Sequence, residues 1–231
     1  MVLLLILLTY TAGCLEDEGD DGNGDDEPKE VLANAGTNVV GVVGEPVTFN
    51  ASASSGPIVR YTWGISVDAA SPNITVLEGV EADHTFVEAG KYLVTLTVVG
   101  DKDQNSSITI HTFIDLIKSI SGTVSLSERN ETYEYTIADN VQAVRLTLTY
   151  ARGTLLNPYT LDMEVYTDET QPIVTTATQV PDQGDTQVEE LDLSVPALLD
   201  YGGFRIVVHW TTAPTSEVSF EIDVEIMYSG I

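Results

Sequence analysis

The stretch EVSFEIDVEIMY, residues 217–228, decides the fold class, because its apolar and polar side chains alternate without interruption. Val218 and Phe220 fall on one side of the chain, and Ser219 and Glu221 fall on the other. Successive side chains of a β-strand face opposite sides of the sheet. The stretch therefore predicts a strand with one buried face and one solvated face.

The same two-residue period recurs from Val39 onward, with turn residues at intervals of about 8–12 positions, which is typical of an all-β sandwich. No long amphipathic helix is found, and Pro196–Tyr201 could form at most one helical turn. We predict two Ig-like or jelly-roll-type β-sandwiches, residues 32–116 and 117–231, with a short junction near Leu116–Ser119. The predicted strands are Pro46–Ala51, Ile58–Ile65, Lys91–Val99, Ser107–Ile114, Gly122–Leu126, Thr132–Ile137, Ala143–Tyr150, Leu161–Thr167, Val188–Leu193, Phe204–Trp210 and Glu217–Tyr228.

The charge balance of the chain narrows the choice of partners. Across 231 residues, 36 acidic and 9 basic side chains give a net charge of −27. A surface this negative repels phosphate backbones, so nucleic acid is excluded as an expected partner. It also keeps a protein soluble at high ionic strength, which favours a salt-adapted source. A hydrophobic fraction of 43% excludes a wholly disordered chain.

The N-terminal segment ends at the only cysteine of the sequence, Cys14. Val2–Leu8 is an apolar run far shorter than the ~20 residues of a membrane-spanning helix. Small residues, Thr11–Gly13, lead directly to the cysteine, so residues 1–13 resemble the signal peptide and lipobox of a lipoprotein. No basic residue precedes the apolar run, and a plain secretory peptide with an incidental cysteine is the alternative. We expect Cys14 to be lipidated and the protein to be anchored on the extracellular face of the cell membrane.

Residues 14–31 are expected to form a disordered tether. The segment from Leu15 to Glu30 contains nine acidic residues and several glycines but a single basic residue, Lys29, so charge repulsion keeps it extended. Asp21–Asp25 has the first, third and fifth ligand spacing of a calcium loop. The sixth position is Asp26 instead of glycine, and leucine stands where the loop needs its final glutamate. A solvated linker is therefore favoured over a calcium site, and no cofactor is expected.

Residues 33–115 carry three ordered blocks of a known pattern and resemble a PKD domain, the Ig-like sandwich common on microbial surfaces and in secreted hydrolases. The resemblance implies core aromatic positions at Tyr61, Trp63, Phe86 and Tyr92. The chain departs from the family at Gly64–Ser66, where the family usually carries two aspartates, so the resemblance carries over the fold but no role for those aspartates. The blocks are GEPVTFNASAS (44–54), IVRYTW (58–63), and HTF (84–86) followed by GKYLVTLTV (90–98).

Residues 119–231 resemble the small sandwich found C-terminal to secreted peptidases, the prepeptidase C-terminal (PPC) domain. The points of similarity are three strand-like segments, and the resemblance implies a second sandwich of the same general class. The segments are EYTI (134–137), LDMEVY (161–166) and GFRIVV (203–208).

Candidate catalytic groups do not form a recognisable pattern. His84, His111 and His209 are far apart in the sequence and lie in or beside predicted strands, where histidines are usually packing residues. No nucleophile elbow, phosphate loop or zinc motif is present. Asp162 and Glu164 alternate with apolar residues, which favours solvent-facing positions over a paired-carboxylate hydrolase. We therefore predict a protein that is not an enzyme.

Four Asn-x-Ser/Thr triplets are candidate N-glycosylation sites: Asn50, Asn73, Asn105 and Asn130. Asn50 is the weakest of them, because it lies in a predicted strand. Glycans at these positions would add bulky, solubilising cover to an exported protein.

The sequence leaves three functional hypotheses. The leading one is a non-enzymatic surface lipoprotein whose sandwiches act as spacer, adhesion, or carbohydrate- or protein-binding modules. In the second, the chain is an accessory subunit or remnant of a secreted peptidase or glycosidase. The third is a solute-binding lipoprotein that feeds a transporter, a class that usually needs a larger two-lobed α/β body.

Overall fold

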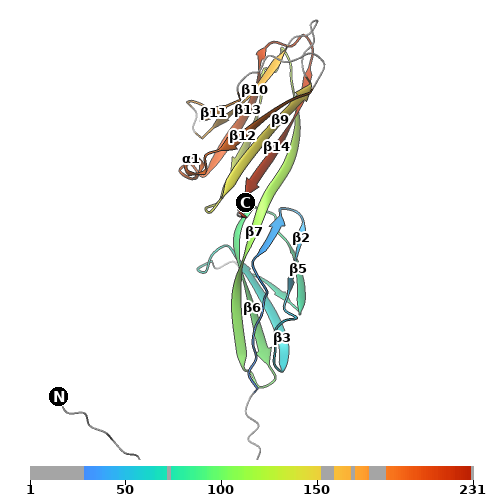
Figure 1. The fold of residues 1–231 in the computed structure, drawn as a ribbon, viewed down its shortest axis with the longest axis vertical. Helices are drawn as coiled ribbons and strands as arrows, with labels where there is room; N and C mark the ends of the chain where they lie inside the picture. The colour runs from blue at the N-terminus through green and yellow to red at the C-terminus, as the bar shows by residue number, and fades with distance from the viewer. Residues whose placement is uncertain (1–28, 72–73, 152–158, 168–169, 177–185, 230–231) are drawn as a thin grey trace, which may run out of the picture.

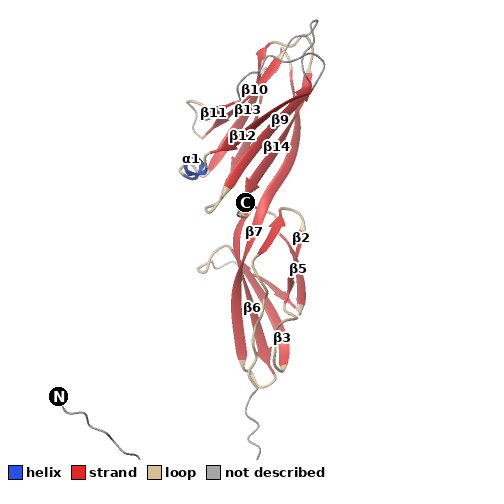
Figure 2. Ribbon diagram, viewed as in Figure 1, coloured by secondary structure: helices blue, strands red, loops and turns tan. Residues whose placement is uncertain are grey.

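The protein is an all-β molecule, as predicted (Figure 2). Its one helix in the described ranges is α1 (Val195–Leu199), which lies where the sequence allows one helical turn. None of the helical structure described is long and apolar enough to span a bilayer. The computed structural model describes residues 29–71, 74–151, 159–167, 170–176 and 186–229.

Two units are stacked along the long axis of the molecule, and one strand, β7, runs through both (Figure 1). The N-terminal unit contains β1 (Val39–Val42), β2 (Pro46–Asn50), β3 (Ile58–Ser66), β4 (Thr75–Glu78), β5 (Glu81–Thr85), β6 (Gly90–Gly100) and the first half of β7 (Asn105–Val124). The C-terminal unit contains the second half of β7 with β8 (Asn130–Thr136), β9 (Ala143–Ala151), β10 (Thr160–Tyr166), β11 (Val174–Thr175), β12 (Thr186–Leu193), β13 (Gly203–Thr212) and β14 (Val218–Met227).

One eight-stranded sheet passes through both units because β7 changes its partner halfway along. Residues 105–114 pair with β6, and residues 116–124 pair with β14. The order of this sheet is β12-β9-β14-β7-β6-β3-β4, and β1 pairs in parallel with β7. Each unit adds a second layer: β2-β5 in the N-terminal unit and β11-β10-β13-β8 in the C-terminal unit.

The strand predictions are wrong at β7, where Ser107–Ile114 and Gly122–Leu126 were expected as separate strands. The intervening residues lack clean alternation, yet β14 supplies backbone partners from Leu116 to Val124, and backbone pairing does not depend on side-chain pattern. The predicted junction near Leu116–Ser119 therefore lies inside a paired strand. Four short strands were also not predicted from the sequence: β1, β4, β5 and β11.

Each unit has its own hydrophobic cluster. In the N-terminal unit Trp63 and Leu96 are fully buried, and the indole Nε1 of Trp63 donates to the Gly79 carbonyl at 3.1 Å. In the C-terminal unit Leu148 and Ile222 are fully buried between the two layers. Each fully buried side chain of this kind stabilises its unit by about 1.5–3 kcal/mol.

The junction between the units is held by Asp115, a buried residue of β7. Its Oδ1 accepts the backbone N–H groups of Tyr228 at 2.7 Å and Ser229 at 3.1 Å, and its Oδ2 accepts the Ser229 hydroxyl at 2.7 Å. The Tyr228 hydroxyl in turn accepts the N–H of Ala138 at 2.8 Å. Because β7 is continuous, these bonds fix the C-terminal end of the chain to the strand that both units share.

Candidate functional site

Several residues selected from the sequence lie outside the described residues. Among them are Cys14, residues 14–28 of the predicted tether, and Asn73. The last residues of that tether were wrongly expected to be disordered, because Val31 is buried in the N-terminal cluster and the Lys29 carbonyl accepts from Gln104 Nε2 at 2.8 Å. Of the other three candidate glycosylation sites, Asn105 and Asn130 are exposed first residues of β7 and β8. Asn50, also exposed, donates through Nδ2 to Glu81 Oε1 at 2.7 Å, and its Oδ1 accepts a backbone N–H at 2.8 Å. Its amide is thus already engaged at both ends.

The four aromatic positions implied by the PKD resemblance gather in the N-terminal unit. Trp63 and Phe86 are buried, while Tyr61 and Tyr92 are half-buried and pack against the same cluster. Phe86 contacts Tyr92 with ring centroids 4.5 Å apart. These side chains form a core, and the Tyr92 hydroxyl donates to the Glu88 carbonyl at 2.8 Å.

The histidines are dispersed over both units. His84 packs edge-on against Phe86 with centroids 4.6 Å apart, and His111 lies 6.2 Å from Phe113. Within the part of the chain that the structure describes, no group of three or more His, Cys, Asp or Glu side chains could hold a metal ion. The candidate site in the described residues therefore consists of hydrogen-bonding and aromatic groups.

The outer face of the β11-β10-β13-β8 sheet carries such chemistry. Strand alternation sends Met163 of β10 and Ile206 of β13 into the core, where both are fully buried. The same alternation sends Glu164, Tyr166 and Arg205 to the opposite face. Antiparallel pairing aligns Tyr166 with Arg205, so the two strands place these side chains next to each other.

A chain of contacts fixes the side chains on this face. The Tyr166 hydroxyl donates to Glu164 Oε2 at 2.6 Å, and Glu164 Oε1 lies 3.8 Å from His209 Nε2. The Arg205 guanidinium lies over the Tyr166 ring, 4.9 Å from its centroid. The hydrogen bond to Glu164 raises the pKa of Tyr166, and burial raises it further. Tyr166 is therefore a neutral hydrogen-bonded platform with a fixed ring.

Two nitrogen atoms on this face lack a hydrogen-bond partner although both are buried: Arg205 Nε and His209 Nδ1. An unpaired buried donor costs roughly 1–3 kcal/mol. Both atoms are shielded from solvent, so neither of them presents a hydrogen-bonding group to a ligand on this face.

Tyr201 reaches the same face from the turn after α1. Pro196 lies in the first turn of the helix, Leu198 is fully buried, and Gly202 has a φ of +67° that ends the turn. The N–H groups of Tyr201 and Gly202 both donate to the Leu198 carbonyl. The buried leucine and the capped turn thus hold the Tyr201 side chain outward, where it is 57% exposed.

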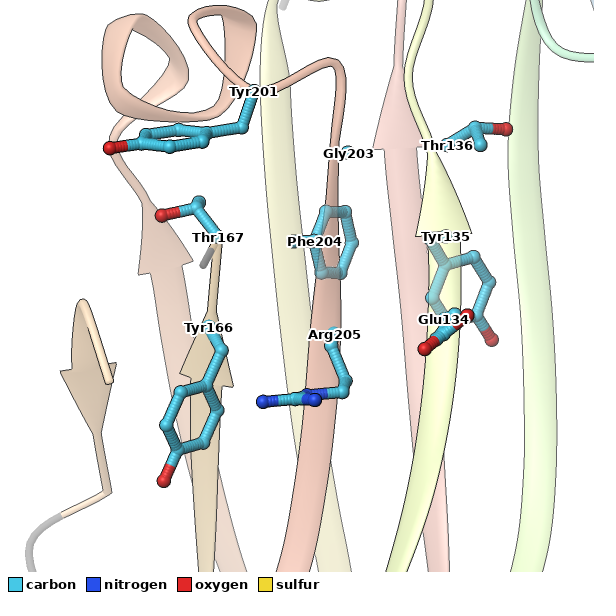
Figure 3. Close-up of a pocket in the computed structure, with 9 residues that line it drawn as sticks. All are labelled: Glu134, Tyr135, Thr136, Tyr166, Thr167, Tyr201, Gly203, Phe204 and Arg205. Carbon is cyan, nitrogen blue, oxygen red and sulfur yellow. The ribbon is translucent and has the colours of Figure 1, made fainter. Parts of the chain in front are cut away.

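These side chains surround an open hollow of about 390 Å³, which we call the outer-face hollow (Figure 3). Tyr166, Thr167 and Tyr201 lie on one side of Arg205, and Glu134 lies on the other. The lining combines aromatic rings with donors and acceptors of hydrogen bonds, and its volume falls within the range of small-ligand sites. The full lining is Glu134, Tyr135, Thr136, Tyr166, Thr167, Tyr201, Gly203, Phe204 and Arg205.

The sequence did not single out this constellation. Strand alternation indicates the face of each side chain, but the pairing of β10 with β13 and the position of α1 are needed to bring Tyr166, Arg205 and Tyr201 together. One expectation was wrong: Asp162 is not solvent-facing, since it is only 9% exposed. Glu164 is half-buried and hydrogen-bonded to Tyr166.

Comparison with known proteins identifies part of the chain. The family model of the PKD domain matches residues 32–114, which confirms the resemblance inferred over residues 33–115. The likeness of residues 119–231 to a PPC domain stays a prediction. No curated protein matches the chain.

Alignments with solved structures are weak. One structure comes from work on the promiscuous specificity of carbohydrate-binding modules of the β-sandwich superfamily. It is 14% identical in sequence over 88% of this chain and 98% of that one, with a TM-score of 0.31. The structure of CBM51-2 in complex with GlcNAc and INT domains from Clostridium perfringens ZmpB is 9% identical in sequence. The alignment covers 86% of this chain and 48% of that one, with a TM-score of 0.27. The structure of Bacteroides ovatus SGBP-B in complex with a mixed-linkage heptasaccharide is 10% identical in sequence. The alignment covers 86% of this chain and 52% of that one, with a TM-score of 0.26. This chain spans about half the length of the latter two.

Proposed function

We propose that this chain, whose residues 32–114 form a PKD domain, is a non-enzymatic surface lipoprotein that holds a carbohydrate-binding face away from the membrane. The observation that carries the proposal is the outer-face hollow. It places Tyr166 and Tyr201 beside the hydrogen-bonding groups of Arg205 and Glu134. The anchor would be a lipid on Cys14.

Carbohydrate is the ligand class that best fits this lining. A sugar ring has an apolar C–H face, which packs on an aromatic ring, and a rim of hydroxyl groups, which need donors and acceptors at the edge. Tyr166 is held in place by Glu164 and Arg205, so it offers a ring that loses little side-chain entropy on binding. Tyr201 is the exposed second ring.

The spacer role is supported by β7. The strand has 20 residues, and a rise of ~3.3 Å per residue gives a continuous length of roughly 66 Å. No flexible linker separates the units, because the junction lies inside this paired strand and is held by Asp115. A rigid body of this kind, preceded by an acidic tether, would keep the hollow clear of the membrane surface.

The binding proposal is tested by an oligosaccharide array probed with the full-length chain and with Tyr201→Ala and Leu126→Ala. Leu126 is also exposed, at 66%, and does not line the hollow, so it is the matched control. We expect the wild type and L126A to bind the same glycans and Y201A to lose about tenfold or more in affinity. Equal binding by Y201A, or no glycan bound by the wild type, would overturn the proposal.

The anchoring proposal is tested by intact-mass analysis and membrane fractionation. The mature protein is expected to begin at Cys14 with the added mass of lipid, and Cys14→Ala is expected to move the protein out of the membrane fraction. A mature chain that keeps residues 1–13 would remove the anchor, while the array measurement would still decide whether the hollow binds sugar.

A further inference from the structure

A second hollow, of about 420 Å³, lies where the two units meet. We call it the junction hollow. The PKD domain contributes the segment Val87–Ala89 and Val43 to its lining, and the C-terminal unit contributes residues of β8 and the segment that follows it. The remaining lining residues are Leu116, Glu134, Tyr135, Thr136, Ile137, Ala138 and Ile226.

The junction hollow and the outer-face hollow adjoin along β8. Glu134, Tyr135 and Thr136 of β8 line both of them. In the close-up of the outer-face hollow, Glu134 and Thr136 mark the side away from Tyr166 and Tyr201 (Figure 3). The two hollows therefore lie next to each other, one beside the two tyrosines and one against the PKD domain, and we call them together the groove.

We infer that this groove binds an uncharged oligosaccharide chain, with its first sugar on Tyr166 and Tyr201 and further sugars across the junction against Val87 of the PKD domain. This inference rests on the proposed function, because it extends the ligand of the same site. It gives the PKD domain a direct part in binding, beyond the role of a spacer.

The PKD side of the groove is preformed. The Tyr92 hydroxyl donates to the Glu88 carbonyl at 2.8 Å, which fixes the segment from Val87 to Ala89. Ala89 packs against the hydrophobic cluster of the C-terminal unit, and Val87 projects into solvent with 83% of its surface exposed. A groove held open by the fold needs little ordering when a chain binds.

The lining favours an uncharged chain over an acidic one. Between Val87 and β8 the junction hollow has apolar walls and two acidic side chains, Glu88 and Glu134, but no basic side chain. The whole chain carries a net charge of −27, which adds to the repulsion of a polyanion. An uncharged oligosaccharide can place its C–H faces on the apolar walls and donate hydroxyl protons to the carboxylates.

The test is a length series of uncharged oligosaccharides, from monosaccharide to hexasaccharide, made from the sugar that binds best on the array. Affinities are measured by titration calorimetry for the full-length wild type, Val87→Glu and Val59→Glu. Val59 is the control, because it is an exposed valine of the PKD domain, at 67%, and lines neither hollow. Thermal unfolding of each variant checks that the fold is kept.

For the wild type we expect affinity to rise with chain length beyond the disaccharide. V87E is expected to weaken the longer oligosaccharides about tenfold and to leave the monosaccharide unchanged, because it removes the apolar surface on which the C–H faces of the further sugars would pack. V59E is expected to match the wild type throughout.

The extended groove is wrong if affinity does not grow with oligosaccharide length, or if V87E and V59E bind the longer oligosaccharides equally. The proposed function still stands in either case, provided that Y201A weakens binding. If Y201A has no effect on any length, both proposals are wrong. Tighter binding of a uronic acid series than of the uncharged series would contradict the choice of an uncharged chain.

Discussion

Glu189 is a carboxylate that the fold buries without pairing it fully. It belongs to the inward-facing set of β12 and is only 7% exposed. Its Oε1 lies 3.4 Å from the Tyr150 hydroxyl, and its Oε2 has no hydrogen-bond partner. Burial raises the pKa of Glu189, a hydrogen bond from Thr176 opposes this rise, and the nearby charge of Asp162 adds to it.

The raised pKa gives a signed prediction for stability. The folded state holds the Glu189 proton more tightly than the unfolded state, so this residue makes the free energy of unfolding fall as pH rises from the ordinary pKa of 4.5 to the raised folded value. We expect Glu189→Gln to remove this slope and to add about 1 kcal/mol of stability at neutral pH. Denaturant unfolding across this pH interval measures both effects.

Glu190→Gln is the control for this substitution, because Glu190 is the next residue of β12 and faces solvent. It is expected to change stability little. If E189Q and E190Q behave alike, or if E189Q destabilises the protein at neutral pH, then the buried carboxylate carries no cost and the assignment is wrong.

At the scale of elements, the pairing of β7 with the C-terminal end of the chain depends on Asp115. Asp115→Ala would leave two backbone N–H groups and the Ser229 hydroxyl without their acceptor. Each unpaired buried group costs roughly 1–3 kcal/mol, and water can reach Ser229, so we expect a loss of about 2–4 kcal/mol. Thermal unfolding measures it.

Asp115→Asn separates the hydrogen bonds from the charge, because an amide oxygen can still accept from Tyr228 while the amide nitrogen cannot accept from the Ser229 hydroxyl. D115N is expected to fall between D115A and the wild type. Asp101→Ala, in an exposed turn, serves as the control and is expected to be near neutral. Wild-type stability in D115A would show that the junction does not depend on this residue.

The shared strand also has a consequence for the whole molecule. Because β7 contributes to both hydrophobic clusters and to one continuous sheet, the two units are expected to unfold together in a single calorimetric transition. Leu96→Ala in the N-terminal cluster and Leu148→Ala in the C-terminal one should each lower that same transition, since a buried Leu→Ala change costs about 2–5 kcal/mol.

Two separate transitions, one sensitive only to L96A and the other only to L148A, would contradict this coupling. In that case the units are independent, and the junction hollow would not keep a fixed shape. The calorimetric result therefore also bears on the groove inferred between the PKD domain and the C-terminal unit.

The sequence alone determined the fold class, most strand positions and the PKD domain. Each of these depends on local information: the two-residue alternation of β14 follows from the geometry of a single strand, and the PKD blocks lie in order along one segment. The helical turn of α1 was likewise readable from its neighbouring residues.

The tertiary structure decided what the strands do together. Side-chain patterns do not specify which strands pair or in what register, so the continuity of β7, the alignment of Tyr166 with Arg205 and the burial of Glu189 could not be derived from alternation. Tyr201 joined the site only because α1 packs beside the sheet. The candidate site is a product of non-local pairing, which a one-dimensional pattern does not contain.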